Sequence, residues 1–246
     1  MKPRVSIVIP AYNEGSDIED VLGRLSEGVK LPSEIVVVVD SPDDSTVPYV
    51  QKYAKTDPRV RVVVNTVEPG PAQAIRFGFE CAEAGVVVVT MADGCDDPQQ
   101  IDPLVRLVER GVVIAAASRY SRGGQQVGGP FLKGLLSRMA GASLWAFARV
   151  GTHDATNSFK AYDLDFVRRV GISSNAGFEI GIELIAKARR ARLPVAELPT
   201  IWLERHQGMS NFRLMSWMPH YIRWWRFEFG PRLEIDEIRT TSDGRS

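Results

Sequence analysis

Short apolar runs alternate with amphipathic stretches over the first half of the chain. The runs are rich in β-branched residues, which favour strands, and the stretches between them repeat apolar residues at helical spacing. The predicted strands cover Val5–Ile9, Glu34–Val39, Val60–Asn65, Val86–Val89 and Val112–Ala117. The predicted helices are the stretch with Ile18, Val21, Leu22 and Leu25 on one face and the ranges 48–55, 72–85 and 99–110. This alternation predicts an α/β fold with a mostly parallel, doubly wound sheet.

An acidic loop follows the run Val86–Val89. Four consecutive valines indicate a strand buried on both faces, and Asp93, Asp96 and Asp97 come soon after its end. Open parallel sheets bind ligands beyond the carboxyl ends of their strands, and clustered carboxylates suit a hard divalent cation. The alternative is a simple helix cap, since acidic residues often begin a helix without binding any ligand. These residues alone leave both interpretations open.

The alternation ends at a glycine-rich polar segment, 121–130, which predicts a mobile loop. An amphipathic helix is predicted from Phe131 onward, and the range 152–170 reads as loop, short strand and short helix. The range 177–193 predicts a strong helix, whose basic last turn suits the helix dipole. Pro199 predicts that the following strand lies at an edge of the sheet or ends there.

An aromatic and basic segment, 212–237, follows. Its large apolar side chains are interspersed with Arg213, Arg223, Arg226 and His220. Such a helix suits a membrane interface, where rings lie at headgroup level and cations meet lipid phosphate. The alternative is that the segment packs on the core or forms a dimer contact. The tail, 238–246, is predicted to be disordered.

Composition excludes several classes of protein. Thirty Lys and Arg balance thirty Asp and Glu, and the basic residues are scattered, so we expect no nucleic-acid partner. The two cysteines, Cys81 and Cys95, are too few for a secreted disulfide framework and indicate reduced thiols. The first apolar run is too short for a signal peptide, and no apolar stretch reaches the roughly 20 residues that span a bilayer.

Six motifs occur in the order typical of inverting family 2 glycosyltransferases. They are SIVIPAYNE, VVVVDSPDDST, GPAQAIRFGF, TMADGCDDP, ASRY and RHQGMS. The set most resembles the dolichol-phosphate mannosyltransferase branch, over residues 4 to 215. The resemblance implies a GT-A fold at 1–211, before the amphipathic segment, with a nucleoside diphosphate sugar, a Mg²⁺ or Mn²⁺ ion and often a polyprenyl phosphate.

The resemblance also assigns roles to individual residues. Arg119 and Arg205 match phosphate contacts, and arginine suits phosphate because its planar fork donates two parallel hydrogen bonds. Asp93 matches the second acid of the metal motif, and with the two arginines it forms the implied catalytic set. The implied substrate-binding residues are Pro10, Ala11, Tyr12, Glu14, Asp40, Gln73, Asp93, Asp154, Asn157, Glu179 and Ser210. Glu183, one turn after Glu179, either shares that sugar-facing role or pairs with Lys187.

The chain departs from the family pattern at the metal motif. Met91 stands where the first acid is usual, and Cys95 stands at a later ligand position. Asn211 replaces a lysine near the C-terminus. We therefore expect the cation to depend on Asp93, with Cys95 and Asp96 as the other candidate ligands.

The implied reaction moves a hexose, of mannose or glucose type, from a nucleoside diphosphate sugar to a polyprenyl phosphate. A phosphate monoester has a second pKa of about 6, so it needs no strong general base. None of His153, His206 and His220 is placed by its motif for that role.

We expect a cytoplasmic protein, peripheral at the cytoplasmic membrane face, with the membrane surface and a separate membrane-anchoring protein as further partners. Two alternatives stay open. One is a cytosolic glycosyltransferase acting on a glycan or small-molecule hydroxyl, for which Asp96, Asp97 or Asp154 would be the base. The other is a catalytically impaired nucleotide-sugar-binding protein.

Overall fold

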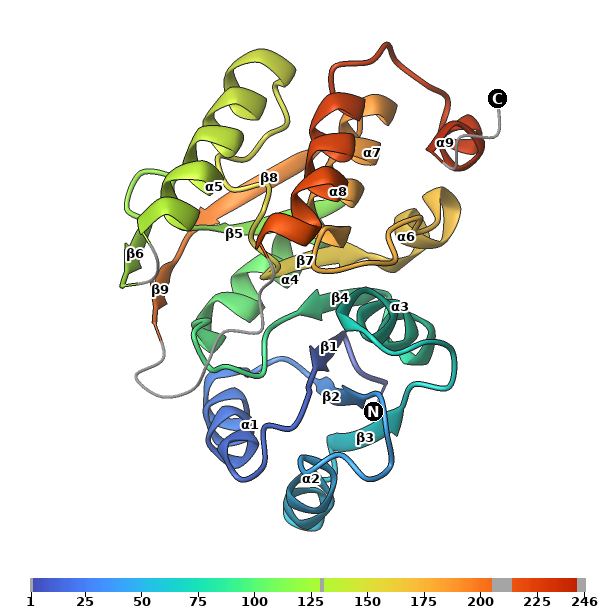
Figure 1. Cartoon of the computed structure of the whole chain (residues 1–246). Helices are drawn as coiled ribbons and strands as arrows, with labels where there is room; N and C mark the ends of the chain where they lie inside the picture. The colour runs from blue at the N-terminus through green and yellow to red at the C-terminus, as the bar shows by residue number, and fades with distance from the viewer. Residues whose placement is uncertain (1, 129–130, 205–213, 243–246) are drawn as a thin grey trace.

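The computed structural model describes residues 2–128, 131–204 and 214–242. Seven strands in these residues form one sheet with the order β3-β2-β1-β4-β7-β5-β8 (Figure 1). Their bounds are β1 Val5–Pro10, β2 Ser33–Val39, β3 Val60–Val64, β4 Val86–Val89, β5 Ile114–Ser118, β7 Lys160–Asp163 and β8 Val195–Pro199. All neighbours pair in parallel except β7, which lies antiparallel between β4 and β5. The predicted mostly parallel, doubly wound sheet is confirmed.

The strands β1, β2, β4 and β5 are buried on both faces because helices cover both sides of the sheet. Successive residues of β2 belong to different cores, with Val36 and Val38 on one face and Val37 and Val39 on the other. The helices of the first half are α1 Asp17–Gly28, α2 Val47–Ala54, α3 Pro71–Cys81 and α4 Ile101–Glu109, and α4 follows a 3₁₀ turn, η1, at Pro98–Gln100. Helices α1, α2 and α4 share one core, and α3 packs in the other.

Close packing of α3 on the sheet depends on Gly78. A Cβ atom at this position would overlap the side chain of Val8 on β1. The small residue therefore lets the helix approach the strand, which fixes the first turn of α3 beside the ends of β2 and β3.

The second half adds helices to the α3 side of the sheet. These elements are α5 Phe131–Ser143, a π-helical turn η2 at Leu144–Ala148, α6 Leu164–Val170, α7 Ile180–Ala191, α8 Leu214–Phe227 and α9 Ile235–Ser242. Within the described residues, β6 (Gln125–Val127) and β9 (Ile201–Leu203) form a separate parallel pair. Pro199 ends the edge strand β8, as its position in the sequence predicts.

The C-terminal segment is more buried than an interfacial helix alone would be. Trp224 of α8 is 1% exposed, and its indole nitrogen donates to Ser174 Oγ at 2.9 Å. Ile238 of α9 is fully buried in the same core. The predicted disorder at 238–246 is therefore wrong for 238–242, because this residue anchors a short helix.

Candidate active site

The polar side chains that follow the strands meet at one edge of the sheet. Strands β1, β2, β4 and β5 run in the same direction, because β7 reverses direction between the last two. Their carboxyl ends therefore lie together, as in other open α/β sheets that bind ligands there.

Asp40, directly after β2, organises the loop that leads into α3. Its carboxylate accepts hydrogen bonds from Asn65 Nδ2 at 2.9 Å and from the Gly70 N–H at 2.8 Å. Gln73 lies in the first turn of α3 and is 6% exposed, yet its Oε1 accepts no hydrogen bond from the described residues. A buried acceptor of this kind needs a donor, which a ligand or a water molecule can provide.

The loop after β1 is held from the opposite side by Asp44. Its carboxylate accepts from the N–H of Asn13 at 3.0 Å, and Asn13 has a left-handed φ of 55°. The N–H of Glu14 donates to Thr46 Oγ1 at 3.0 Å. Tyr12 is left 61% exposed, so its ring is accessible at the rim of the site.

The acidic loop after β4 separates its carboxylates. Asp96 is buried and turned inward, and it accepts from Thr90 Oγ1 at 2.9 Å and from the Met91 N–H at 3.2 Å. Asp93 Oδ1 accepts from the N–H of Cys95 at 3.0 Å. Burial and, secondarily, the nearby Asp93 raise the pKa of Asp96 to about 7. The half-buried Asp93 is therefore better placed than the buried Asp96 to contact a cation.

Arg24 of α1 fixes the shape of this loop. Its guanidinium donates to the carbonyl oxygen of Gly94 and, at 3.1 Å, to that of Asp96. Because Arg24 of α1 binds two carbonyl oxygens of this loop, the turn that carries the Asp93 carboxylate is held in one shape.

Arg119, directly after β5, forms a buried ion pair with Asp154. Its Nε and Nη2 atoms donate to the two carboxylate oxygens of Asp154 at 2.7 and 2.8 Å, and its N–H donates to Asp154 at 3.0 Å. The side chains are 12% and 0% exposed. Burial opposes the charge of Arg119, but the carboxylate outweighs it and raises the pKa of the guanidinium. The same guanidinium donates to Ser137 Oγ of α5 at 3.3 Å.

A cavity of about 220 Å³ lies beside this ion pair. Its lining residues are Arg119, Tyr120, Gly124, Arg138, Ala142 and His153. The guanidinium of Arg138 lies 5.0 Å from the centre of the Tyr120 ring, and no carboxylate of the described residues forms an ion pair with it. The cavity is therefore cationic, which favours an anionic ligand.

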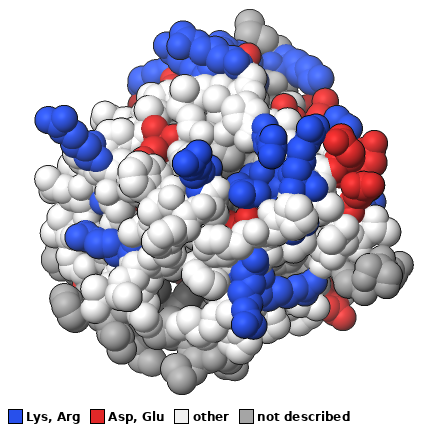
Figure 2. All heavy atoms as spheres, turned by 90° about the horizontal axis from the view of Figure 1, so that it is seen from above, with Lys and Arg blue, Asp and Glu red and all other residues white. Residues whose placement is uncertain are grey.

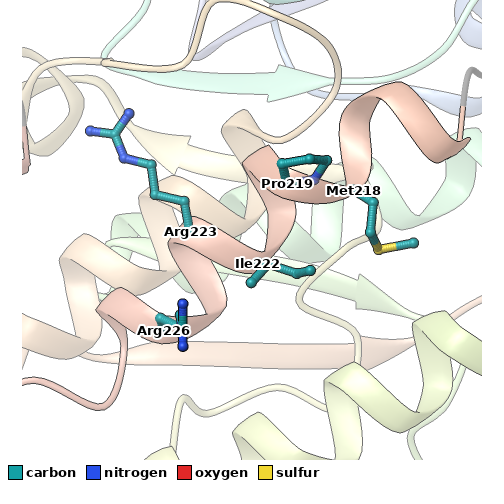
Figure 3. A pocket seen from close by; sticks show the side chains of 5 residues that line it. All are labelled: Met218, Pro219, Ile222, Arg223 and Arg226. Carbon is teal, nitrogen blue, oxygen red and sulfur yellow. The ribbon is translucent and has the colours of Figure 1, made fainter.

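An open groove of about 620 Å³ follows the exposed face of α8 and is lined by Met218, Pro219, Ile222, Arg223 and Arg226 (Figure 3). Apolar and cationic side chains thus lie together on the face opposite to the buried Trp224. Figure 2 shows that lysine and arginine also predominate over acidic residues on the face above α5, α7 and α8. No helix in the described part of the chain is long and apolar enough to cross a bilayer.

A sequence-family model described as Glycosyl transferase family 2 matches residues 6–171, more than half of the chain. The chain belongs to glycosyltransferase family 2. An undecaprenyl-phosphate mannosyltransferase of Micrococcus luteus is 31% identical over 85% of this chain and 87% of its own. A polyprenol monophosphomannose synthase of Mycolicibacterium smegmatis is 30% identical over 85% of this chain and 80% of its own.

A dolichol-phosphate mannosyltransferase of Pyrococcus furiosus is 31% identical over 96% of this chain, which spans 66% of that protein. Among solved structures, the glucosyl-3-phosphoglycerate synthase of Mycobacterium tuberculosis, in complex with Mn²⁺ and UDP-glucose, has a TM-score of 0.69. It is 18% identical over 94% of this chain and 81% of its own. This likeness shows the GT-A fold of the family 2 enzyme.

Three residues that the motifs place on the sugar make contacts within the protein. Asp154 is fully buried, and Arg119 donates to both of its carboxylate oxygens. Asn157 donates to the carbonyl of Ala117 at 2.8 Å and ties its loop to β5. Glu179 is fully buried and accepts from two backbone N–H groups of its own loop.

The expected metal ligand set also does not form. The described residues contain no cluster of three acidic, histidine or cysteine side chains that could hold a cation. Asp96 is turned into the protein, and Cys95 is buried with its Sγ 3.8 Å from the backbone oxygen of Asp93. Two further predicted site residues, Arg205 and Ser210, lie outside the described residues.

Several residues near the site make contacts that the motifs did not predict, although the resemblance places Lys160 in the sugar-facing segment. Arg24 contacts a loop about seventy residues away, and nothing in its own helix indicates this contact. Lys160, fully buried on β7, donates to the carbonyls of Ala155 and Asn157. Glu183 Oε1 lies 2.6 Å from Lys187 Nζ in a buried ion pair. Of the two roles open to Glu183, this is the pairing with Lys187 and not the sugar-facing one. His153 lines the cationic cavity, although its motif gave no reason to place it there.

Proposed function

We propose that this enzyme transfers a hexose from a nucleoside diphosphate sugar to a polyprenyl phosphate at a membrane surface. The observation that carries the proposal is the position of α5. The helix contributes Arg138 and Ala142 to the cationic cavity, and it also exposes apolar side chains to solvent. A lipid phosphate has the same two-part character, with an anionic head and an apolar tail.

The exposed apolar residues extend from α5 into the π-helical turn and are Leu135, Leu136, Met139, Trp145 and Phe147. Phe147 is 78% exposed, which is unusual for a phenylalanine that has no partner to cover it. The apolar and cationic groove of α8 supplies a second surface suited to lipid headgroups and acyl chains. We propose that both surfaces rest on the bilayer, with the acceptor phosphate entering the cavity.

We propose that the nucleotide binds at the same edge of the sheet but near the ends of β1 and β2, away from the cationic cavity. Asp40 and Gln73 offer hydrogen-bond acceptors to the base and ribose, and Tyr12 offers an exposed ring. Asp93 would hold Mg²⁺ or Mn²⁺ together with the donor diphosphate and water, a ligand set that Mg²⁺ commonly accepts with one protein carboxylate. Bound there, the cation would supply charge stabilisation to the leaving diphosphate.

The proposed reaction is a single inverting displacement. A phosphate oxygen of the acceptor attacks the anomeric carbon while the bond from that carbon to the diphosphate breaks. Arg119 is held by Asp154 in a fixed orientation, so it stabilises phosphate charge without reorganising. A soluble phosphorylated acceptor is the alternative, because it would use the same cations without the apolar surfaces.

The test is transfer of radiolabelled sugar from a panel of GDP- and UDP-sugars, with Mg²⁺ or Mn²⁺, to polyprenyl phosphate in liposomes. Label in the organic phase that falls on the order of 100-fold in Asp93→Asn supports the proposal. Arg168→Gln, which changes an exposed cation on α6, is the matched control and should keep wild-type transfer. Label that appears only on water-soluble phosphate acceptors would refute the lipid acceptor, and no turnover would refute catalysis.

A further inference from the structure

His153 is held in one orientation by contacts on two sides. Its Nδ1 lies 2.6 Å from Glu197 Oε1, and its ring stacks on Trp145 with 4.4 Å between centroids and 23° between planes. A carboxylate can only accept, so Nδ1 carries the proton. In the neutral ring Nε2 is therefore a proton acceptor, and no described residue is hydrogen-bonded to it.

Glu197 is placed for this contact by its other oxygen. Its Oε2 accepts from the His153 N–H at 2.8 Å and from Thr152 Oγ1 at 3.1 Å. The carboxylate comes from the edge strand β8 and is 16% exposed, so it is a fixed partner for an imidazolium as well as for a neutral ring.

The histidine faces the same cavity as Arg119. Charged or titratable groups approach it from each neighbouring element: Glu197 of β8, Arg119 and Tyr120 after β5, Arg138 of α5 and Asp154 of its own loop. Asp154 offsets part of the charge of Arg119, so Arg138 and the histidine are also needed to meet the charge of a bound phosphate. Imidazole is the side chain whose charge changes in the pH range where a phosphate monoester loses its second proton.

We infer that His153 removes the second proton of the acceptor phosphate, with Glu197 as its positioning residue. This inference rests on the proposed function. The proton passes from the phosphate monoanion to Nε2, and the imidazolium is stabilised by the carboxylate at Nδ1. An oxygen of the resulting dianion forms the bond to the anomeric carbon, and the bond to the diphosphate breaks. The product is a phosphodiester monoanion, and the imidazolium returns its proton to solvent.

The proton transfer matters most at low pH, because most of the acceptor then arrives as the monoanion. His153→Gln should lower kcat/KM for the lipid acceptor on the order of 10-fold at about pH 5, where roughly nine-tenths of a phosphate with a second pKa of about 6 keeps its second proton. The loss should shrink to less than about 2-fold near pH 8.5, where the acceptor arrives ionised. Glu197→Gln should show the same pH trend with a smaller loss, and Arg168→Gln should keep the wild-type profile.

The experiment measures these profiles on the full chain in liposomes, with nucleoside diphosphate binding and thermal unfolding as checks on each variant. A loss of equal size at every pH would overturn the proton role, since it would show only a lost contact. A His153→Gln profile equal to wild type would also overturn it. Absence of lipid transfer by the wild-type protein would instead refute the proposed function. If His153→Gln fails to bind nucleotide, the Glu197→Gln profile decides, and a wild-type profile there overturns the inference.

Discussion

Replacement of Asp154 by alanine should destabilise the enzyme by about 3–5 kcal/mol, because it leaves a buried guanidinium without its counter-charge. The estimate follows from the contacts that disappear. Three donors of Arg119 lose their acceptor, and the arginine side chain is only 12% exposed, so water replaces few of these bonds. A domain of this kind is stable by only about 5–15 kcal/mol, so the loss should be visible in any unfolding experiment.

The more informative variant is Asp154→Asn, which keeps the shape and one acceptor oxygen but removes the charge. We expect it to cost about 1–3 kcal/mol. Urea unfolding of this variant, of Arg119→Met and of the double variant forms a double-mutant cycle. The double variant should cost less than the sum of the single changes by at least about 1 kcal/mol, because each single change strands one buried charge.

A kinetic measurement on the same variants tests the role of Asp154 in catalysis. If Asp154 positions Arg119, Asp154→Asn should reduce kcat/KM for the acceptor while nucleoside diphosphate affinity stays unchanged. The reasoning is refuted if Asp154→Ala costs less than about 1 kcal/mol, or if the cycle shows no coupling. Either outcome would mean that the guanidinium reaches solvent once its partner is gone.

Two further predictions concern Arg24, which the motifs did not identify, and Lys160, whose contacts they did not predict. Arg24→Met should weaken binding of a nucleoside diphosphate with Mn²⁺ about 10-fold, because two carbonyls of the Asp93 loop lose their hydrogen bonds to the guanidinium. The free energy of unfolding should change by less than about 1 kcal/mol. Calorimetric titration measures this, and unchanged affinity would contradict the role. Burial lowers the pKa of Lys160 to about 7, so the unfolded chain binds more protons between about 7 and 10.5. Wild-type stability relative to Lys160→Met should therefore rise through that window by up to about 1.4 kcal/mol per pH unit, and parallel pH curves would exclude a neutral lysine.

Much of the sheet could be predicted because its inner strands β1, β2 and β4 are apolar runs that must be buried on both faces. Val86–Val89 is the clearest case, since four valines leave no polar side for solvent. The local motif also located Asp93 and Arg119 correctly at strand ends. What failed was the direction of the neighbouring carboxylates. Whether an acid such as Asp96 points outward depends on donors brought by the fold, and here Thr90 and a backbone N–H draw it inward.

Contacts between distant segments could not be predicted in the same way. The pair of His153 and Glu197 joins residues 44 positions apart, and it exists because the loop before β7 lies beside β8. The short helix α9 escaped prediction for a related reason. Its sequence is polar except for Ile235 and Ile238, and two apolar residues become informative only when α6 and α7 are there to receive them.

Helix α8 cannot be exchanged as an independent anchor. One face contributes Trp224 to the core, bonded to Ser174, and the opposite face carries the groove proposed to meet lipid. A chain shortened at residue 213 would therefore lose a wall of its catalytic domain together with the groove proposed to meet lipid. Any change that redesigns this enzyme for use in free solution must keep the buried half of the helix and alter only Met218, Ile222 and their exposed neighbours.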